Sequence, residues 1–81
     1  MFSAEKIEQM VATRFPGAMA QVRDMTGTSD HFELLVVSVA FEGKRLVERH
    51  RMVYEALGAV VGAEIHALSL KTLTPAEAER T

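Results

Sequence analysis

The stretch Phe41–Tyr54, FEGKRLVERHRMVY, decides the fold of this chain. It predicts the end of a strand, then a turn at Gly43, then an amphipathic helix. Glycine suits the turn because it adopts a positive φ without steric cost. The residues on one side of the helix recur at the spacing of a single helical face, and they are Leu46, His50, Val53, Leu57 and Val60. A histidine is therefore expected in the middle of an apolar stripe.

The residues before this stretch predict a helix followed by two strands. The helix is expected to begin after Ser3, whose hydroxyl can cap its first turn, and to stop at Pro16-Gly17. A weakly patterned strand follows over 18–25, and the polar residues 26–30 favour a turn. The run His31–Phe41 is rich in β-branched and aromatic residues and predicts a central antiparallel partner strand. Its apolar residues fall on both faces, so cover on both sides is expected for part of its length.

A third strand and a short helix are expected after the long helix. Residues 63–72 alternate as a strand does. Thr74-Pro75-Ala76-Glu77 then combines an N-cap, a proline at the first helical position and a glutamate that can complete a capping box. The order helix, strand, strand, helix, strand, helix predicts an α+β fold, with helices packed on a small three-stranded mixed sheet.

Length and composition set bounds on the function. A chain of 81 residues forms one domain, here 1–81, and buries only about 60% of its unfolded surface. No apolar run approaches the roughly 20 residues that span a bilayer, and no signal peptide is readable, so a cytoplasmic protein without a membrane role is expected. No nucleophile–base pair and no phosphate loop can be named, which predicts a non-enzymatic protein without a small-molecule substrate.

The absence of cysteine restricts the possible chemistry further. Any thiolate must come from another molecule, because this chain has none. The net charge of −2 argues against a dedicated nucleic-acid binder. A local basic patch for a partner or a nucleic acid is nevertheless expected, and it consists of Lys44, Arg45, Arg49 and Arg51. The alternative is an ordinary solvated helix face, with these cations paired to Glu48 and Glu55.

Three histidines are the candidate ligands. His50 is expected to be buried or half-buried and hydrogen-bonded to backbone. His31 opens the second strand and His66 stands early on the third, so the two could approach each other, although both could equally be ordinary strand-end residues. Two neutral imidazoles make an incomplete zinc site. They would suit an iron–sulfur cluster whose remaining ligands are thiolates from elsewhere.

Three blocks of the sequence together resemble the BolA family. They are Phe41–Tyr54, the strand block 65–75 (IHALSLKTLTP) and Asp30–Leu34 (DHFEL), and they span most of the chain. The resemblance implies a fold like the class II KH domain. It also implies partnership with a monothiol glutaredoxin, in a heterodimer that shares a [2Fe–2S] cluster.

The resemblance also implies roles for particular residues. His66 corresponds to the family's cluster ligand, while the glutaredoxin and its glutathione supply the thiolates. A second ligand, Cys or His, often lies in the loop between the first two strands, where this chain has Thr28 and Ser29. That role is therefore carried to His31. The family is also described as transcriptional regulators, so DNA binding through the Arg-His-Arg helix is the alternative, although the chain lacks the Gly-x-x-Gly loop of nucleic-acid-binding KH domains.

Overall fold

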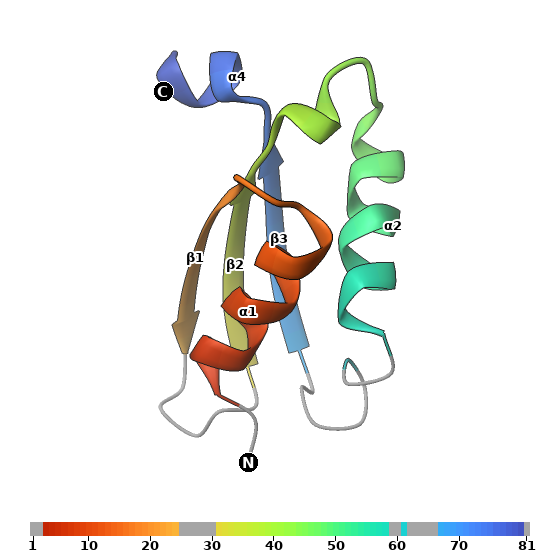
Figure 1. Ribbon diagram of the computed structural model, residues 1–81. Helices are drawn as coiled ribbons and strands as arrows, with labels where there is room; N and C mark the ends of the chain where they lie inside the picture. The colour runs from red at the N-terminus through yellow and green to blue at the C-terminus, as the bar shows by residue number, and fades with distance from the viewer. Residues whose placement is uncertain (1–2, 25–30, 59–60, 62–66, 81) are drawn as a thin grey trace.

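The computed structural model describes residues 3–24, 31–58, 61 and 67–80 (Figure 1). Its elements confirm the α+β order expected from the sequence. In chain order they are the helix α1 (Ala4–Arg14), the strands β1 (Met19–Asp24) and β2 (His31–Val37), the 3-10 helix η1 (Val39–Phe41), the helix α2 (Leu46–Leu57), the strand β3 (Ala67–Leu73) and the helix α4 (Pro75–Glu79).

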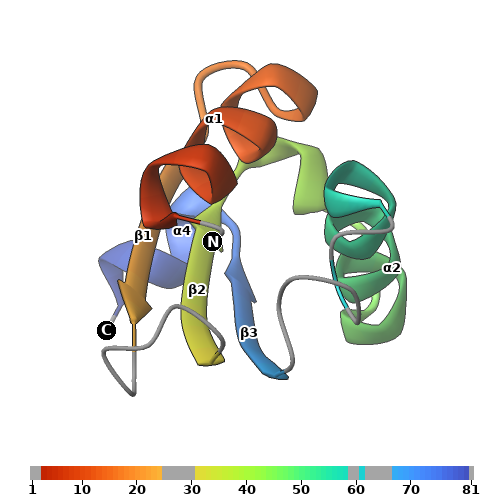
Figure 2. The ribbon, with the colours of Figure 1, turned by 90° about the horizontal axis from the view of Figure 1, so that it is seen from below.

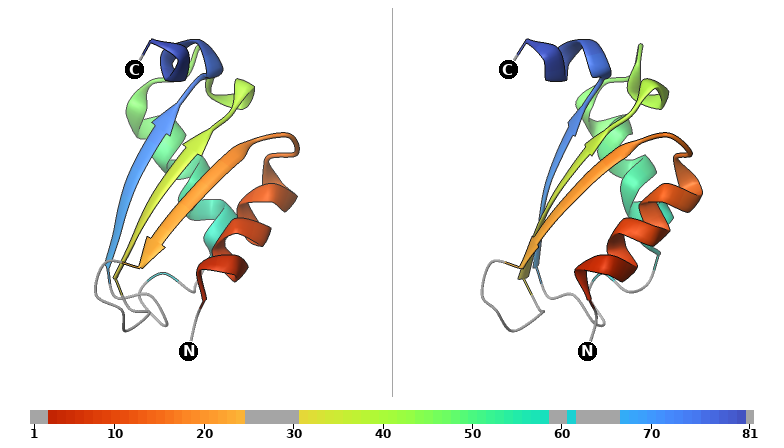
Figure 3. Two further views of the ribbon diagram at one scale, coloured as in Figure 1. Left: turned by 90° about the vertical axis from the view of Figure 1, so that its left-hand side faces the viewer. Right: turned by 60° about the vertical axis from the view of Figure 1, so that its left-hand side comes forward.

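The three strands form one mixed sheet in the order β1-β2-β3. β1 runs antiparallel to β2, whereas β2 and β3 are parallel, with His31 beside Ala67 and Val37 beside Leu73. A parallel pair needs a long crossover connection, and α2 lies within it. Figures 2 and 3 show α1 and α2 on the same face of the sheet, with α4 at one end and toward the other side.

The core lies between that face and the two helices. Successive strand residues point to opposite faces, so β2 directs Phe32, Leu34 and Val36 toward the helices, and all three are fully buried. The helices and the segments next to them contribute the rest of the core, namely Ile7, Val11, Phe15, Phe41, Val53 and Leu57. The sequence predicted that the second face of β2 is also covered for part of its length. Among the residues on that face, Val37 at the end of the strand is buried, with 8% of its surface exposed.

The central strand is shorter than the sequence predicts. It ends at Val37 rather than Phe41, and the residues assigned to its end form η1. The hydroxyl of Ser38 accepts a hydrogen bond from the backbone N–H of Ala40 at 3.0 Å, which turns the chain out of the sheet. This turn lets Phe41 enter the core, where its ring packs against Phe15 with centroids 5.4 Å apart.

The structure confirms the predicted turn at Gly43 and the buried part of the apolar stripe predicted for α2. Gly43 has a φ of +76°, and the stripe residues Val53 and Leu57 are buried. The prediction was wrong for Leu46, whose side chain is 61% exposed. Leu46 is the first residue of the helix, and helical side chains lean back toward the N-terminus, so it projects beyond the packed part of the helix. Val60 lies outside the described residues.

The predicted caps are confirmed at both ends of the chain. The Ser3 hydroxyl accepts a hydrogen bond from the backbone N–H of Lys6 at 3.2 Å, and Thr74 and Glu77 complete the capping box of α4. The third strand reaches Leu73, one residue further than expected. The predicted strand residues 63–66 lie outside the described part of the chain. None of the described helices is long and apolar enough to cross a membrane.

Candidate functional site

Two strands begin side by side at one end of the sheet. The parallel register places His31, the first residue of β2, beside Ala67, the first residue of β3. His31 is half-buried, and because Phe32 points into the core, His31 belongs to the opposite face, over which α1 and α2 do not lie. His66, the predicted ligand, lies outside the described residues, but it directly precedes Ala67 in the chain.

The face that carries His31 is hollowed into a shallow groove of about 370 Å³. Gln21, Arg23, Glu33, Leu35, Ser69 and Lys71 supply the lining from that face. Glu33 follows His31 by two residues, and its carboxylate lies 3.4 Å from the Arg23 guanidinium on the neighbouring strand. Both side chains of this ion pair are largely exposed, so the pair contributes little to stability. The sequence did not predict this groove.

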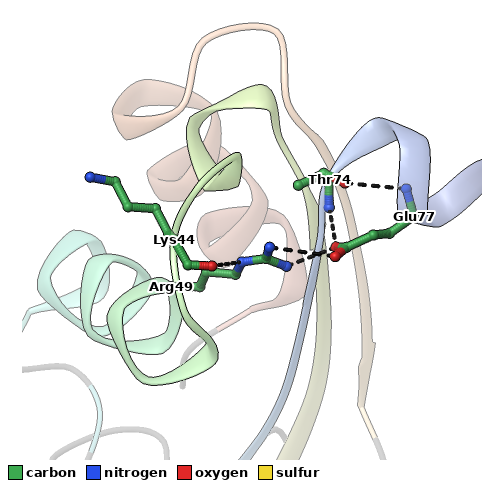
Figure 4. Close-up of polar contacts among 4 residues, drawn as sticks. All are labelled: Lys44, Arg49, Thr74 and Glu77. Carbon is green, nitrogen blue, oxygen red and sulfur yellow. Dashed lines mark hydrogen bonds and ion pairs between the residues drawn. The ribbon is translucent and has the colours of Figure 1, made fainter.

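Arg49 does not join an exposed basic patch. Its side chain is only 12% exposed, and its Nη1 donates to Glu77 Oε1 at 2.8 Å, with Nη2 3.5 Å from Oε2 (Figure 4). Its Nε donates to the backbone carbonyl of Lys44 at 3.0 Å. This arrangement joins α2 to α4 and fixes the turn that precedes α2. From the sequence, Glu77 was expected only to cap α4, and its ion pair with Arg49 depends on how α2 and α4 pack.

The environment of Glu77 lowers the pKa of its carboxyl group. The hydrogen bond from Arg49 is the largest cause, and the backbone N–H of Thr74, 2.8 Å from Oε1, is the next. Together they bring the pKa from its ordinary 4.5 to about 2. The carboxylate is therefore charged, and the ion pair intact, throughout the physiological pH range.

The other predicted cations differ from Arg49. Arg45 forms an exposed pair with Glu48, whose Oε1 also accepts the backbone N–H of Arg45 at 3.2 Å. That backbone hydrogen bond is the main reason why the pKa of Glu48 is lowered. Lys44 and Arg51 are exposed and form no ion pair with another described residue. The basic patch expected from the sequence is thus reduced to two uncommitted cations.

His50 occupies the predicted stripe of α2 and is half-buried. Its Nε2 atom is buried and has no hydrogen-bond partner in the described structure, so the expected hydrogen bond to backbone is not found at that nitrogen. No group of three or more metal-ligating side chains occurs among the residues that the structure describes. Among the described residues, the corner where β2 and β3 begin holds one of the predicted ligands, the imidazole of His31.

Fold and topology define a small two-layer α+β protein, and comparisons with known proteins identify its class. The family model for BolA-like proteins matches residues 9–77. The DNA-binding transcriptional regulator BolA of Escherichia coli is 34% identical over 86 residues, which cover 98% of this chain and 82% of the relative. Protein BOLA2 of Arabidopsis thaliana is 44% identical over 72 residues, with coverages of 88% and 76%.

Solved structures give the same answer. A bolA protein homologue from Coxiella burnetii matches with a TM-score of 0.83 at 40% identity, over 99% of this chain and 100% of that one. The chain therefore belongs to the BolA family.

Proposed function

We propose that this chain is a non-enzymatic adaptor that pairs with a monothiol glutaredoxin and co-ligates a [2Fe–2S] cluster, in iron–sulfur trafficking or in iron and redox regulation. The observation that carries the proposal is the register of the parallel strands, which sets His31 beside Ala67. His31 is the first residue of β2, and His66 directly precedes Ala67, the first residue of β3, in the chain. Membership of the BolA family adds support.

The available donors fit one half of such a cluster and no more. Histidine can replace cysteine on one iron of a [2Fe–2S] centre, and thiolates supply the remaining ligand positions. This chain has no cysteine, and at most two imidazoles belong to the corner. His66 would hold the cluster with His31 as the second protein ligand, and the partner and its glutathione would contribute the thiolates. The cluster supplies an iron centre that can be passed on or sensed.

The groove beside His31 suits the approach of such a partner. α1 and α2 lie on the other face, so a second protein can reach the His31 side of the sheet without displacing either helix (Figure 3). The Arg23–Glu33 pair is exposed, and rearranging an exposed pair costs little. Leu35 gives the groove an apolar floor.

Spectroscopy of the reconstituted pair tests this proposal. Titration of the purified chain into a cluster-loaded monothiol glutaredoxin should change the visible absorption and circular dichroism, because the ligands of the iron change. His66→Ala should abolish the change. His50→Gln is the matched control, since it removes an imidazole on α2 rather than at the corner, and it should leave the response intact. An unaltered response in His66→Ala would remove His66 from the proposal.

DNA binding is the second candidate function. The name of the Escherichia coli relative favours it. The structure gives it less support, because Arg49 and Arg45 are engaged by Glu77 and Glu48 and leave Lys44 and Arg51 uncommitted. Binding through so few phosphate contacts should be weak, and its affinity should fall with salt at a shallow slope. A steep salt dependence of binding to promoter DNA would raise this candidate above the first.

The cytoplasmic location expected from the sequence stays a prediction.

A further inference from the structure

The outer face of α2 carries two exposed apolar side chains with an arginine between them, and no other described element covers them. Val47, Arg51 and Tyr54 are spaced by four and three residues, so they share one helical face. Val47 is 57% exposed and Tyr54 39% exposed, and the neighbouring Leu46 is 61% exposed. Figures 1 and 2 show α2 at the margin of the molecule, with its outer side turned away from the sheet and α1. Single exposed apolar residues are ordinary, but a group on one helix face indicates an interaction surface.

The charge of this region differs in sign from that of the whole chain. Residues 44–54 contain four Lys and Arg side chains and one Glu, although the chain has a net charge of −2. Glu77 neutralises Arg49 and Glu48 pairs with Arg45, so Lys44 and Arg51 remain available. Figure 4 shows the Lys44 side chain extending away from the Arg49–Glu77 pair. The surface therefore combines two aliphatic side chains with a tyrosine and an arginine, and the last two are residue types that are enriched in protein-binding hot spots.

We propose that this surface, made of Lys44, Leu46, Val47, Arg51 and Tyr54, docks an acidic surface with an apolar centre on a second protein. A partner protein fits better than DNA, because the exposed apolar side chains of Val47 and Tyr54 lie on either side of Arg51, and phosphates gain nothing from contact with them. The surface begins near the end of the sheet where β2 and β3 finish, whereas His31 and Ala67 mark the other end (Figure 1). The chain can thus hold this partner while its histidine corner engages another protein.

Nuclear magnetic resonance titration of the isotope-labelled chain tests the proposal. Two synthetic amphipathic helical peptides with the same apolar face serve as probes, one with glutamate and one with lysine at every polar position, together with a short DNA duplex. The glutamate peptide should shift the amide signals of residues 44–54. Val47→Glu and Arg51→Glu should each weaken its binding by at least about tenfold, because each removes a central contact. Lys71→Glu, an equal charge reversal on the exposed sheet face, should not.

Three outcomes would overturn the proposal. Equal binding of the lysine peptide would show unspecific apolar adhesion, shifts centred on the sheet face would place the contact elsewhere, and stronger, salt-sensitive binding of the duplex would make the surface a DNA site. Val47 and Arg51 are exposed, so both variants should fold, as their amide spectra would show. The titration uses neither a cluster nor a glutaredoxin, so its result is independent of the proposed function.

Discussion

The guanidinium of Arg49 on α2 and the carboxylate of Glu77 on α4 meet at 2.8 Å, across 28 residues of sequence. The same carboxylate accepts the backbone N–H of Thr74, so one side chain both caps α4 and binds α2. The link holds the C-terminal helix against the start of the helix that begins at Leu46. It also removes Arg49 from the surface on which a partner or DNA would act.

Glu77→Gln should lower the melting temperature at pH 7, and the difference from the unmodified protein should disappear in acid. The folded-state pKa of Glu77, about 2, lies below its ordinary value of 4.5. The carboxylate therefore stabilises the fold fully above about pH 4.5, and this contribution is lost as the pH falls toward 2. Thermal unfolding of both proteins between pH 2 and pH 7 measures the difference. Glu79→Gln, also on α4, is the control. A difference that is constant over this pH range would contradict the assigned pKa.

Phe41→Ala should destabilise the protein by about 3–5 kcal/mol, the usual cost of truncating a buried phenylalanine. The ring is fully buried and packs against Phe15. Val39→Ala is the matched control from the same 3-10 helix, because Val39 is 66% exposed, and its effect should stay within about 0.5 kcal/mol. Urea unfolding measures both. Similar effects for the two variants would contradict the 3-10 helix after Ser38, which buries Phe41 and leaves Val39 exposed.

Local signals in the sequence predicted most of the fold. Ser3, Gly43 and the Thr74–Glu77 capping box each act within a few residues, and each is where the sequence placed it. The error at the end of β2 has a different origin. Val39 and Phe41 have the composition of a strand, and the tertiary contact between Phe41 and Phe15 rewards leaving the sheet.

The candidate site was less predictable because it depends on pairing between distant segments. The register that brings His31 beside Ala67 joins segments far apart in the chain, and the periodicity of the sequence does not decide whether His31 and His66 approach each other. The engagement of Arg49 by Glu77 likewise depends on how α2 and α4 pack. The role of His66 as a ligand stays a prediction, since that residue lies outside the described ranges.

Gly43→Ala should destabilise the protein by about 1–2 kcal/mol, the cost of a left-handed conformation for a residue with a Cβ. Gly43 has a φ of +76°, and apart from the glycine and its two chain neighbours no described atom lies within 4 Å of the position that a Cβ would take. The penalty therefore comes from the local backbone conformation and not from a clash with a distant residue. Gly43→Asn should lose less, because asparagine tolerates this region better. Melting temperatures should fall by about 4–8 °C per kcal/mol. Equal losses for alanine and asparagine would contradict a purely conformational cause.

Substitution of His31 tests whether it is the second ligand of the proposed cluster. Histidine in place of cysteine raises the reduction potential of a [2Fe–2S] centre. His31→Cys should therefore lower the potential of the cluster shared with the glutaredoxin, whereas His31→Ala should leave a cluster that is lost more readily. Voltammetry of the purified heterodimer measures the first effect, and the decay of its visible absorption measures the second.

Ser69→Ala is the control for these variants, because Ser69 lines the groove on the face of the sheet that carries His31 and is not a candidate ligand. It should change neither the potential nor the decay of the cluster. If the cluster of the His31→Cys heterodimer has the same reduction potential as that of the unmodified heterodimer, His31 is not bound to iron. The role left for His31 would then be in the contact between the two proteins. Loss of the pair in His31→Ala, with the potential unchanged in His31→Cys, would show that docking role directly.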